Sequence, residues 1–121
     1  MTGFGSRMQL VAISFQGELN KRQCVLVTED LIEALGMNSG PESMFCDYPY
    51  KGKGGVGFTY FQPITESFMT WDVWSDLKGG YLLICSCKLF WVVDVVKVLE
   101  NVGLKPIQVK TEGFSFDVAV L

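Results

Sequence analysis

The stretch that decides the fold is GFTYFQPITESFMTWDVW, residues 57–74. It holds two β-prone runs, residues 57–64 and 67–74, rich in aromatic and β-branched side chains. A third run, GGYLLICSC at residues 79–87, follows the turn-like SDLKGG. Apolar runs of this length joined by short turns predict neighbouring antiparallel strands.

Further strands are predicted toward both ends. Residues 7–16 (RMQLVAISFQ) alternate well enough for a first strand, and residues 43–48 (SMFCDY) predict a short second one. Near the C-terminus, residues 105–110 and 113–121 are expected to form a hairpin around the sequence Thr-Glu-Gly at 111–113.

Two segments carry helical spacing. Between Asn20 and Gly36, four apolar residues recur on one face, although residues 25–27 also suit a strand; they are Cys24, Val27, Leu31 and Leu35. Residues 88–103 predict a second helix, ended by Gly103, with a stripe of Phe90, Val93, Val96 (or Lys97) and Leu99. The order predicts an α+β two-layer sandwich in one domain, residues 1–121: an antiparallel sheet with two helices packed on one face.

Composition narrows the classes of function. The chain has 121 residues, of which 49% are hydrophobic, so an apolar face covered by another subunit, as in a homodimer, is expected. The longest apolar-rich stretch is broken by Lys88, Asp94 and Lys97, which argues against a membrane span. The start lacks signal-peptide features, so a cytoplasmic protein is expected. The formal charge of -3 argues against nucleic acid and suits a cationic small molecule.

The chain contains no histidine, which excludes Ser-His-Asp and Cys-His catalysis. Any chemistry must therefore use carboxylates, thiols, hydroxyls, lysines or a group made from the chain itself. The four cysteines are expected to be thiols rather than disulfides or ligands of a metal, because their spacing does not match a zinc site. They are Cys24, Cys46, Cys85 and Cys87.

Several motifs have a structural reading beside a functional one. Gly52, Gly54 and Gly57 match G-x-G-x-x-G, but a β-like run follows them, so a flexible loop between strands is predicted. Cys85 and Cys87 share one face of their strand and are expected to be packing residues. The aromatic set at 58–74 suits a core or subunit interface, or a surface that stacks on a base or a sulfonium cation; it comprises Phe58, Tyr60, Phe61, Phe68, Trp71 and Trp74.

Three of these segments together carry a resemblance to a known family. They are ITES (residues 64–67), VWSD (residues 73–76) and CSC (residues 85–87), with Ser67 and Cys87 at the matching spacing. With the opening GSRMQLVAISFQG, the chain resembles the small, prokaryotic-type S-adenosylmethionine decarboxylases, which depend on a pyruvoyl group. The resemblance implies that family's fold and a role in polyamine (spermidine) synthesis.

In such a decarboxylase the serine hydroxyl attacks its own upstream carbonyl, and β-elimination then splits the chain and leaves a pyruvoyl group. The resemblance makes Ser67 the precursor of that group, Glu66 the new C-terminus and Cys87 the proton donor. Thr59 matches a hydroxyl that assists processing. The substrate, S-adenosylmethionine or a relative, is expected to contact Trp74, with Phe68 and Trp71 beside it.

The chain departs from the family pattern where histidines are expected. Phe68 directly follows the cleavage serine, and Asp72 occupies the position of the processing histidine. A carboxylate does not replace imidazole in both directions of proton transfer near neutral pH unless burial raises its pKa. We therefore expect slow or absent self-processing, which leaves three hypotheses: a divergent decarboxylase, a non-catalytic homologue that binds an adenosyl ligand or another subunit, and an unrelated α+β domain.

Overall fold

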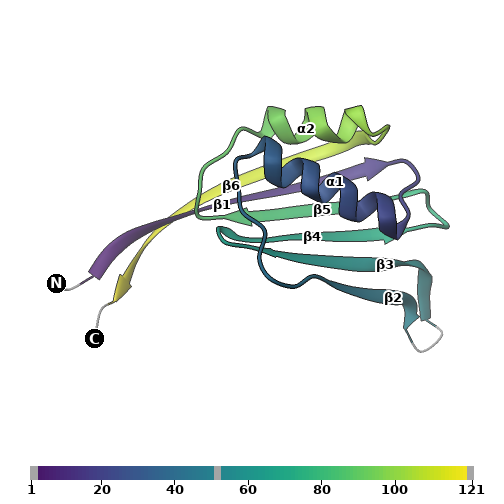
Figure 1. The fold of residues 1–121 in the computed structure, drawn as a ribbon, viewed down its shortest axis with the longest axis horizontal. Helices are drawn as coiled ribbons and strands as arrows, with labels where there is room; N and C mark the ends of the chain where they lie inside the picture. Colours follow the sequence, from purple (N-terminus) through teal and green to yellow (C-terminus); the bar gives the residue numbers. More distant parts are fainter. Residues whose placement is uncertain (1–2, 51–52, 120–121) are drawn as a thin grey trace.

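In the computed structural model, which describes residues 3–50 and 53–119, six strands form one sheet in the order β2-β3-β4-β5-β1-β6. All neighbouring strands are antiparallel. Figure 1 shows both helices over one face of this sheet. The α+β two-layer prediction is confirmed. The strands are β1 (Gly3–Gln16), β2 (Met44–Tyr50), β3 (Lys53–Ile64), β4 (Ser67–Trp74), β5 (Gly79–Ser86) and β6 (Lys105–Ala119), and the helices are α1 (Lys21–Ala34) and α2 (Val92–Asn101).

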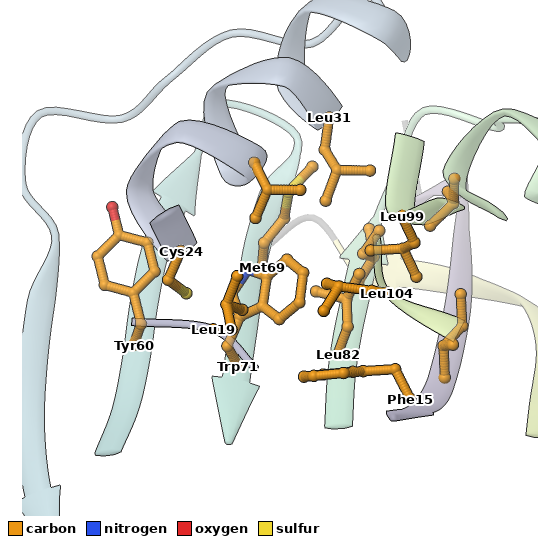
Figure 2. Close-up of a cluster of buried hydrophobic side chains, with 14 of the residues drawn as sticks. Phe15, Leu19, Cys24, Leu31, Tyr60, Met69, Trp71, Leu82, Leu99 and Leu104 are labelled. Carbon is orange, nitrogen blue, oxygen red and sulfur yellow. The ribbon is translucent and has the colours of Figure 1, made fainter. Parts of the chain in front are cut away.

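The core lies between the helices and the face of the sheet that they cover, here called the inner face. Side chains alternate along β4, so that Met69, Trp71 and Val73 are buried while the residues between them face the other way. Figure 2 shows Trp71 within the buried cluster. Its indole Nε1 donates to the hydroxyl of Thr28 on α1 at 2.8 Å, which fixes the helix over the sheet. The opposite face, here called the open face, is covered by neither helix.

Helix α1 forms where the periodicity predicts it, and residues 25–27 are helical. Asn20 caps its N-terminus: the side chain accepts from the backbone N–H of Gln23, and the Gln23 side chain accepts from Asn20 in return. The helix ends before Gly36, whose φ of +64° favours glycine. The buried side chains follow the predicted stripe.

Helix α2 is shorter than predicted and turned differently. It begins at Val92 after an extended N-cap residue, Trp91, and Gln9 donates to and accepts from the backbone of Phe90 just before it. This start places Val95 and Leu99 in the core and leaves Val93 exposed. The predicted stripe was therefore wrong in phase, since only Leu99 of its members is fully buried.

The predicted C-terminal hairpin is wrong. Residues 105–119 form a single strand, β6, that pairs with β1 along its whole length. The reason lies in β1, which begins at Gly3 rather than Arg7 and offers a partner for every residue of β6 except Ile107, so that Gly113 lies opposite Gln9 instead of in a turn. Val120 and Leu121 lie outside the described residues.

The predicted glycine-rich loop is mostly strand. Gly54 and Gly57 belong to β3, while Gly52 lies outside the described residues. At Gly57 a Cβ would collide with the backbone carbonyl of Val73 on β4. This glycine therefore allows close approach of two strands rather than contact with a phosphate.

Candidate functional site

The Glu66-Ser67 peptide lies at the turn between β3 and β4, and the loop after α1 holds this turn. Asn38 donates to the Glu66 carboxylate from its backbone N–H at 3.0 Å and from its side-chain amide at 3.2 Å. The backbone of Thr65 donates to the Asn38 carbonyl at 2.8 Å. The hydrogen bond from the Asn38 backbone is the main cause that lowers the pKa of Glu66 below its usual value. Glu66 is thus an anchor of the turn.

Ser67 and Cys87 lie on either side of this turn but do not share a face. Ser67 lies opposite Ser86, which is fully buried on the inner face, so the alternation directs Ser67 toward the helices. Cys87 is exposed just beyond β5, and its backbone N–H donates to the Glu66 carbonyl at 3.0 Å. The carbonyl that Ser67 would attack therefore has one hydrogen-bond donor.

A second group of predicted residues lies on the open face. The Thr59 hydroxyl donates to the Asp72 carboxylate at 2.5 Å, across β3 and β4. The phenol oxygen of Tyr48 on β2 lies 2.5 Å from the Thr59 oxygen. Because the single hydroxyl proton of Thr59 is given to Asp72, Tyr48 donates to Thr59, and the Tyr48 hydroxyl also donates a longer hydrogen bond of 3.4 Å to the Asp72 carboxylate. Tyr48, Thr59 and Asp72 therefore form one hydrogen-bonded group.

Two further aromatic rings, those of Trp74 and Tyr81, accompany Tyr48 next to this hydrogen-bonded group. The Trp74 ring stacks parallel to Tyr48 at 6.2 Å and meets Tyr81 edge to face at 5.3 Å. Of these rings only Tyr81 lines the open hollow of about 350 Å³ on this face, whose lining also includes Ser14, Asp72 and Lys110. The combination of one carboxylate and several ring faces suits a cation that is not strongly hydrated. We call Tyr48, Thr59, Asp72, Trp74 and Tyr81 the open-face cluster.

The structure does not bring all of the predicted site residues together. Ser67 and Asp72 lie at opposite ends of β4, about 16 Å apart at the usual rise of a strand, and on opposite faces. Phe68 is on the open face, where its ring lies 5.7 Å from that of Phe61 rather than in the cluster. Trp71 is fully buried on the inner face, so it lies away from Trp74.

Three residues of these sites were missed in the sequence. Tyr48 and Tyr81 lie on strands whose register with β3 and β4 cannot be read from spacing alone. Asn38 sits in the turn-like GMNSGPES, where nothing indicates a contact with Glu66. For Tyr81 the sequence did contain a signal: it lies four residues before Cys85, so the two side chains point to the same face of β5.

Comparisons with known proteins support the fold. The crystal structure of the adenosylmethionine decarboxylase from Aquifex aeolicus VF5 superposes with a TM-score of 0.61, covering 90% of this chain and 88% of that one. The two sequences are 9% identical over the match, so the likeness shows a shared fold. No family model matches the chain, and no curated protein matches it by sequence.

The cysteines differ in accessibility. Cys24 lies on the buried face of α1, and burial raises the pKa of its thiol, which keeps it protonated and inert. Cys46 and Cys87 are exposed, and all four are free thiols. Neither helix in the described part of the chain is long and apolar enough to cross a membrane.

Proposed function

We propose that this protein is an S-adenosylmethionine decarboxylase-like homologue that stays uncleaved and binds an adenosyl sulfonium ligand at its open-face cluster. The observation that carries the proposal is the Asp72 carboxylate, which lines an open hollow together with Tyr81, whose ring contacts that of Trp74. The ligand class comes from the resemblance and the fold likeness. The assembly that we propose is a homodimer.

The charge and geometry of the cluster favour a sulfonium over a neutral thioether. Asp72 provides a negative charge, and Thr59 holds one of its oxygens in place. The ring faces of Trp74 and Tyr81 supply the negative side of their quadrupoles to a cation. The formal charge of -3 adds a weak attraction of the same sign.

The positions of the reacting groups support the proposal that the chain stays uncleaved. For self-cleavage, Ser67 needs a base within hydrogen-bond reach of its hydroxyl. Asp72 and Thr59, the residues that match the processing positions, lie about 16 Å away on the other face of the sheet. Asp72 and Thr59 of the same chain are therefore too far away to activate the Ser67 hydroxyl.

A pyruvoyl decarboxylase is the second candidate, and one contact favours it. The backbone N–H of Cys87 donates to the Glu66 carbonyl at 3.0 Å, which is where negative charge would develop when Ser67 attacks. In that case the chain between Glu66 and Ser67 breaks with consumption of water and release of ammonia. The resulting ketone would supply an electron sink for decarboxylation, with Cys87 near it to deliver a proton.

Isothermal titration calorimetry of the full chain tests the first candidate. We expect S-adenosylmethionine to bind, and S-adenosylhomocysteine, which lacks the sulfonium charge, to bind at least about tenfold more weakly. Asp72→Asn and Trp74→Ala should each weaken binding of the sulfonium by about tenfold. The matched control is Asp76→Asn, because Asp76 is an exposed carboxylate on the β4–β5 turn outside the cluster.

No heat with S-adenosylmethionine, or equal losses in Asp72→Asn and Asp76→Asn, would contradict the proposed site. Release of CO₂ from carboxyl-labelled S-adenosylmethionine, abolished in Ser67→Ala and strongly reduced in Cys87→Ala, would instead establish the second candidate.

A further inference from the structure

Strand β6 is an edge strand that buries very little. It ends the sheet order, so among residues 3–50 and 53–119 only β1 pairs with it, and its other edge has no neighbouring strand along fifteen residues. Every side chain from residue 107 to residue 115 is exposed, on both faces of the sheet. These include Ile107 at 59%, Phe114 at 46% and Val109 at 41% exposure. A long and partly apolar edge strand is a template for pairing with another strand.

The other edge of the sheet is better protected. Strand β2 has seven residues, and its register with β3 is irregular between Tyr48 and Tyr50. Asp47 on β2 also makes an ion pair with Lys21 of α1 at 2.6 Å. Short length, irregularity and charge all discourage edge pairing. In β6 the register with β1 is regular from Gly3 to Ser14, and the only proline, Pro106, stands near its start.

We infer that β6 pairs with β6 of a second copy of this chain, antiparallel, about a two-fold axis that passes through Thr111. This inference goes beyond ligand binding and names the surface of the proposed homodimer. The axis is perpendicular to the sheet, so that inner and open faces continue from one copy to the next. In this register Lys110 lies opposite Glu112 of the partner subunit, and by symmetry the contact occurs twice.

The charges select this register over its neighbours. Residues directly opposite each other in an antiparallel pair point to the same face of the sheet. The two-fold axis must therefore pass through a residue of β6 and not between two residues. An axis through Lys110 would place that lysine opposite its own copy, and an axis through Glu112 would do the same with the carboxylate. Like charges directly opposite each other destabilise a strand pair, whereas opposite charges stabilise it. Thr111 is thus the centre that satisfies both charges.

Among the described residues neither Lys110 nor Glu112 makes an ion pair, although Lys110 lines the same hollow as Asp72. Lys110 lies opposite Ala12 and Glu112 lies opposite Leu10 on β1, both apolar neighbours. The ion pairs found among residues 3–50 and 53–119 are Lys21 with Asp47 and Lys78 with Glu18, and neither involves β6. Both side chains are exposed and therefore available to a second copy.

Sedimentation equilibrium of the full chain tests the inference by charge reversal. We expect the wild type to sediment as a dimer, and Lys110→Glu or Glu112→Lys alone to raise the dissociation constant at least about tenfold, since each opposes like charges twice. The double variant Lys110→Glu/Glu112→Lys should recover the dimer. An equimolar mixture of the two single variants should also recover it, because each chain then meets opposite charges. Lys97→Glu, an exposed reversal on α2, is the matched control and should leave the dimer unchanged.

A monomeric wild type would overturn the inference, as would a dimer whose mass is unaffected by Lys110→Glu. Failure of both the double variant and the mixture to recover the dimer, with circular dichroism showing folded chains, would also overturn it. Calorimetry tests the ligand proposal and sedimentation equilibrium tests the dimer, so either proposal can fail while the other stands.

Discussion

Replacing Thr28 by valine tests the placement of α1 over the inner face of the sheet. The Thr28 hydroxyl accepts from the Trp71 indole N–H at 2.8 Å and donates to the Cys24 carbonyl at 2.7 Å. Valine has nearly the same shape, so Thr28→Val removes the acceptor without leaving a cavity. Both Thr28 and Trp71 are essentially inaccessible to water, so the indole N–H is left without a partner.

The cost follows from burying an unsatisfied donor, about 1 to 3 kcal/mol. For a chain of 121 residues, each kcal/mol lowers the melting temperature by about 4 °C, so we expect a fall of about 4–12 °C. Thr28→Ser keeps the acceptor and loses one methyl group, at about 1 kcal/mol. In a Trp71→Phe background the indole N–H is gone, so Thr28→Val should cost about 1 kcal/mol less than in the wild type.

Urea unfolding followed by circular dichroism measures all four chains of this double-mutant cycle. A coupling energy of about 1 kcal/mol or more between positions 28 and 71 supports the geometry. If the two effects simply add, or if Thr28→Val is as stable as the wild type, then Trp71 does not face α1 and the assignment of the two faces of β4 is refuted.

Three further predictions concern the turn, the strands and the thiols. The Asn38 contact lowers the pKa of Glu66 in the folded state, so the stabilisation that this contact gives is present above the usual pKa of 4.5 and is lost as pH falls through the folded pKa. The difference in urea midpoint between wild type and Glu66→Gln should therefore shrink from about pH 6 to about pH 3. A constant difference would argue against the contact. Gly57→Ala should destabilise by more than about 2 kcal/mol while Gly113→Ala, which meets no close atom, changes stability by less than about 1 kcal/mol; equal effects in thermal unfolding would be inconsistent with the β3–β4 approach. A thiol reagent should label Cys87 in the native protein and Cys24 only after unfolding, and rapid labelling of Cys24 would disprove its burial.

The parts of the fold that the sequence predicts are those in which side chains repeat with a clear period. Alternation in residues 67–74 separates the buried Met69 and Trp71 from the outward Phe68 and Trp74, as the structure shows. The helix at 21–34 is similarly marked by Asn20 at its start. Such local patterns are visible because each depends on residues close in the chain.

The errors arise where distant residues decide the structure. The phase of α2 depends on Gln9, far away in the chain, which donates to and accepts from the backbone of Phe90 just before the helix. The sequence Thr-Glu-Gly at 111–113 suits a turn locally, but pairing with β1 keeps it straight. Long-range pairing overrides local preference in both cases.

The candidate site was only partly predictable for the same reason. Thr59 and Asp72 are adjacent across two strands, and the register that joins them comes from the β3–β4 turn. Ser67 and Asp72 differ in parity, so alternation alone already places them on opposite faces. The resemblance brought them into one proposed site, whereas the strand geometry separates them.

The intact mass of the purified full chain, after prolonged incubation at neutral pH, shows whether the chain cleaves itself. We expect a single species with the mass of the uncut chain, heavier than the Ser67→Ala variant by one oxygen atom. Two fragments, residues 1–66 and 67–121, whose summed mass equals that of the chain plus water minus ammonia, would contradict this expectation and establish self-cleavage at Ser67.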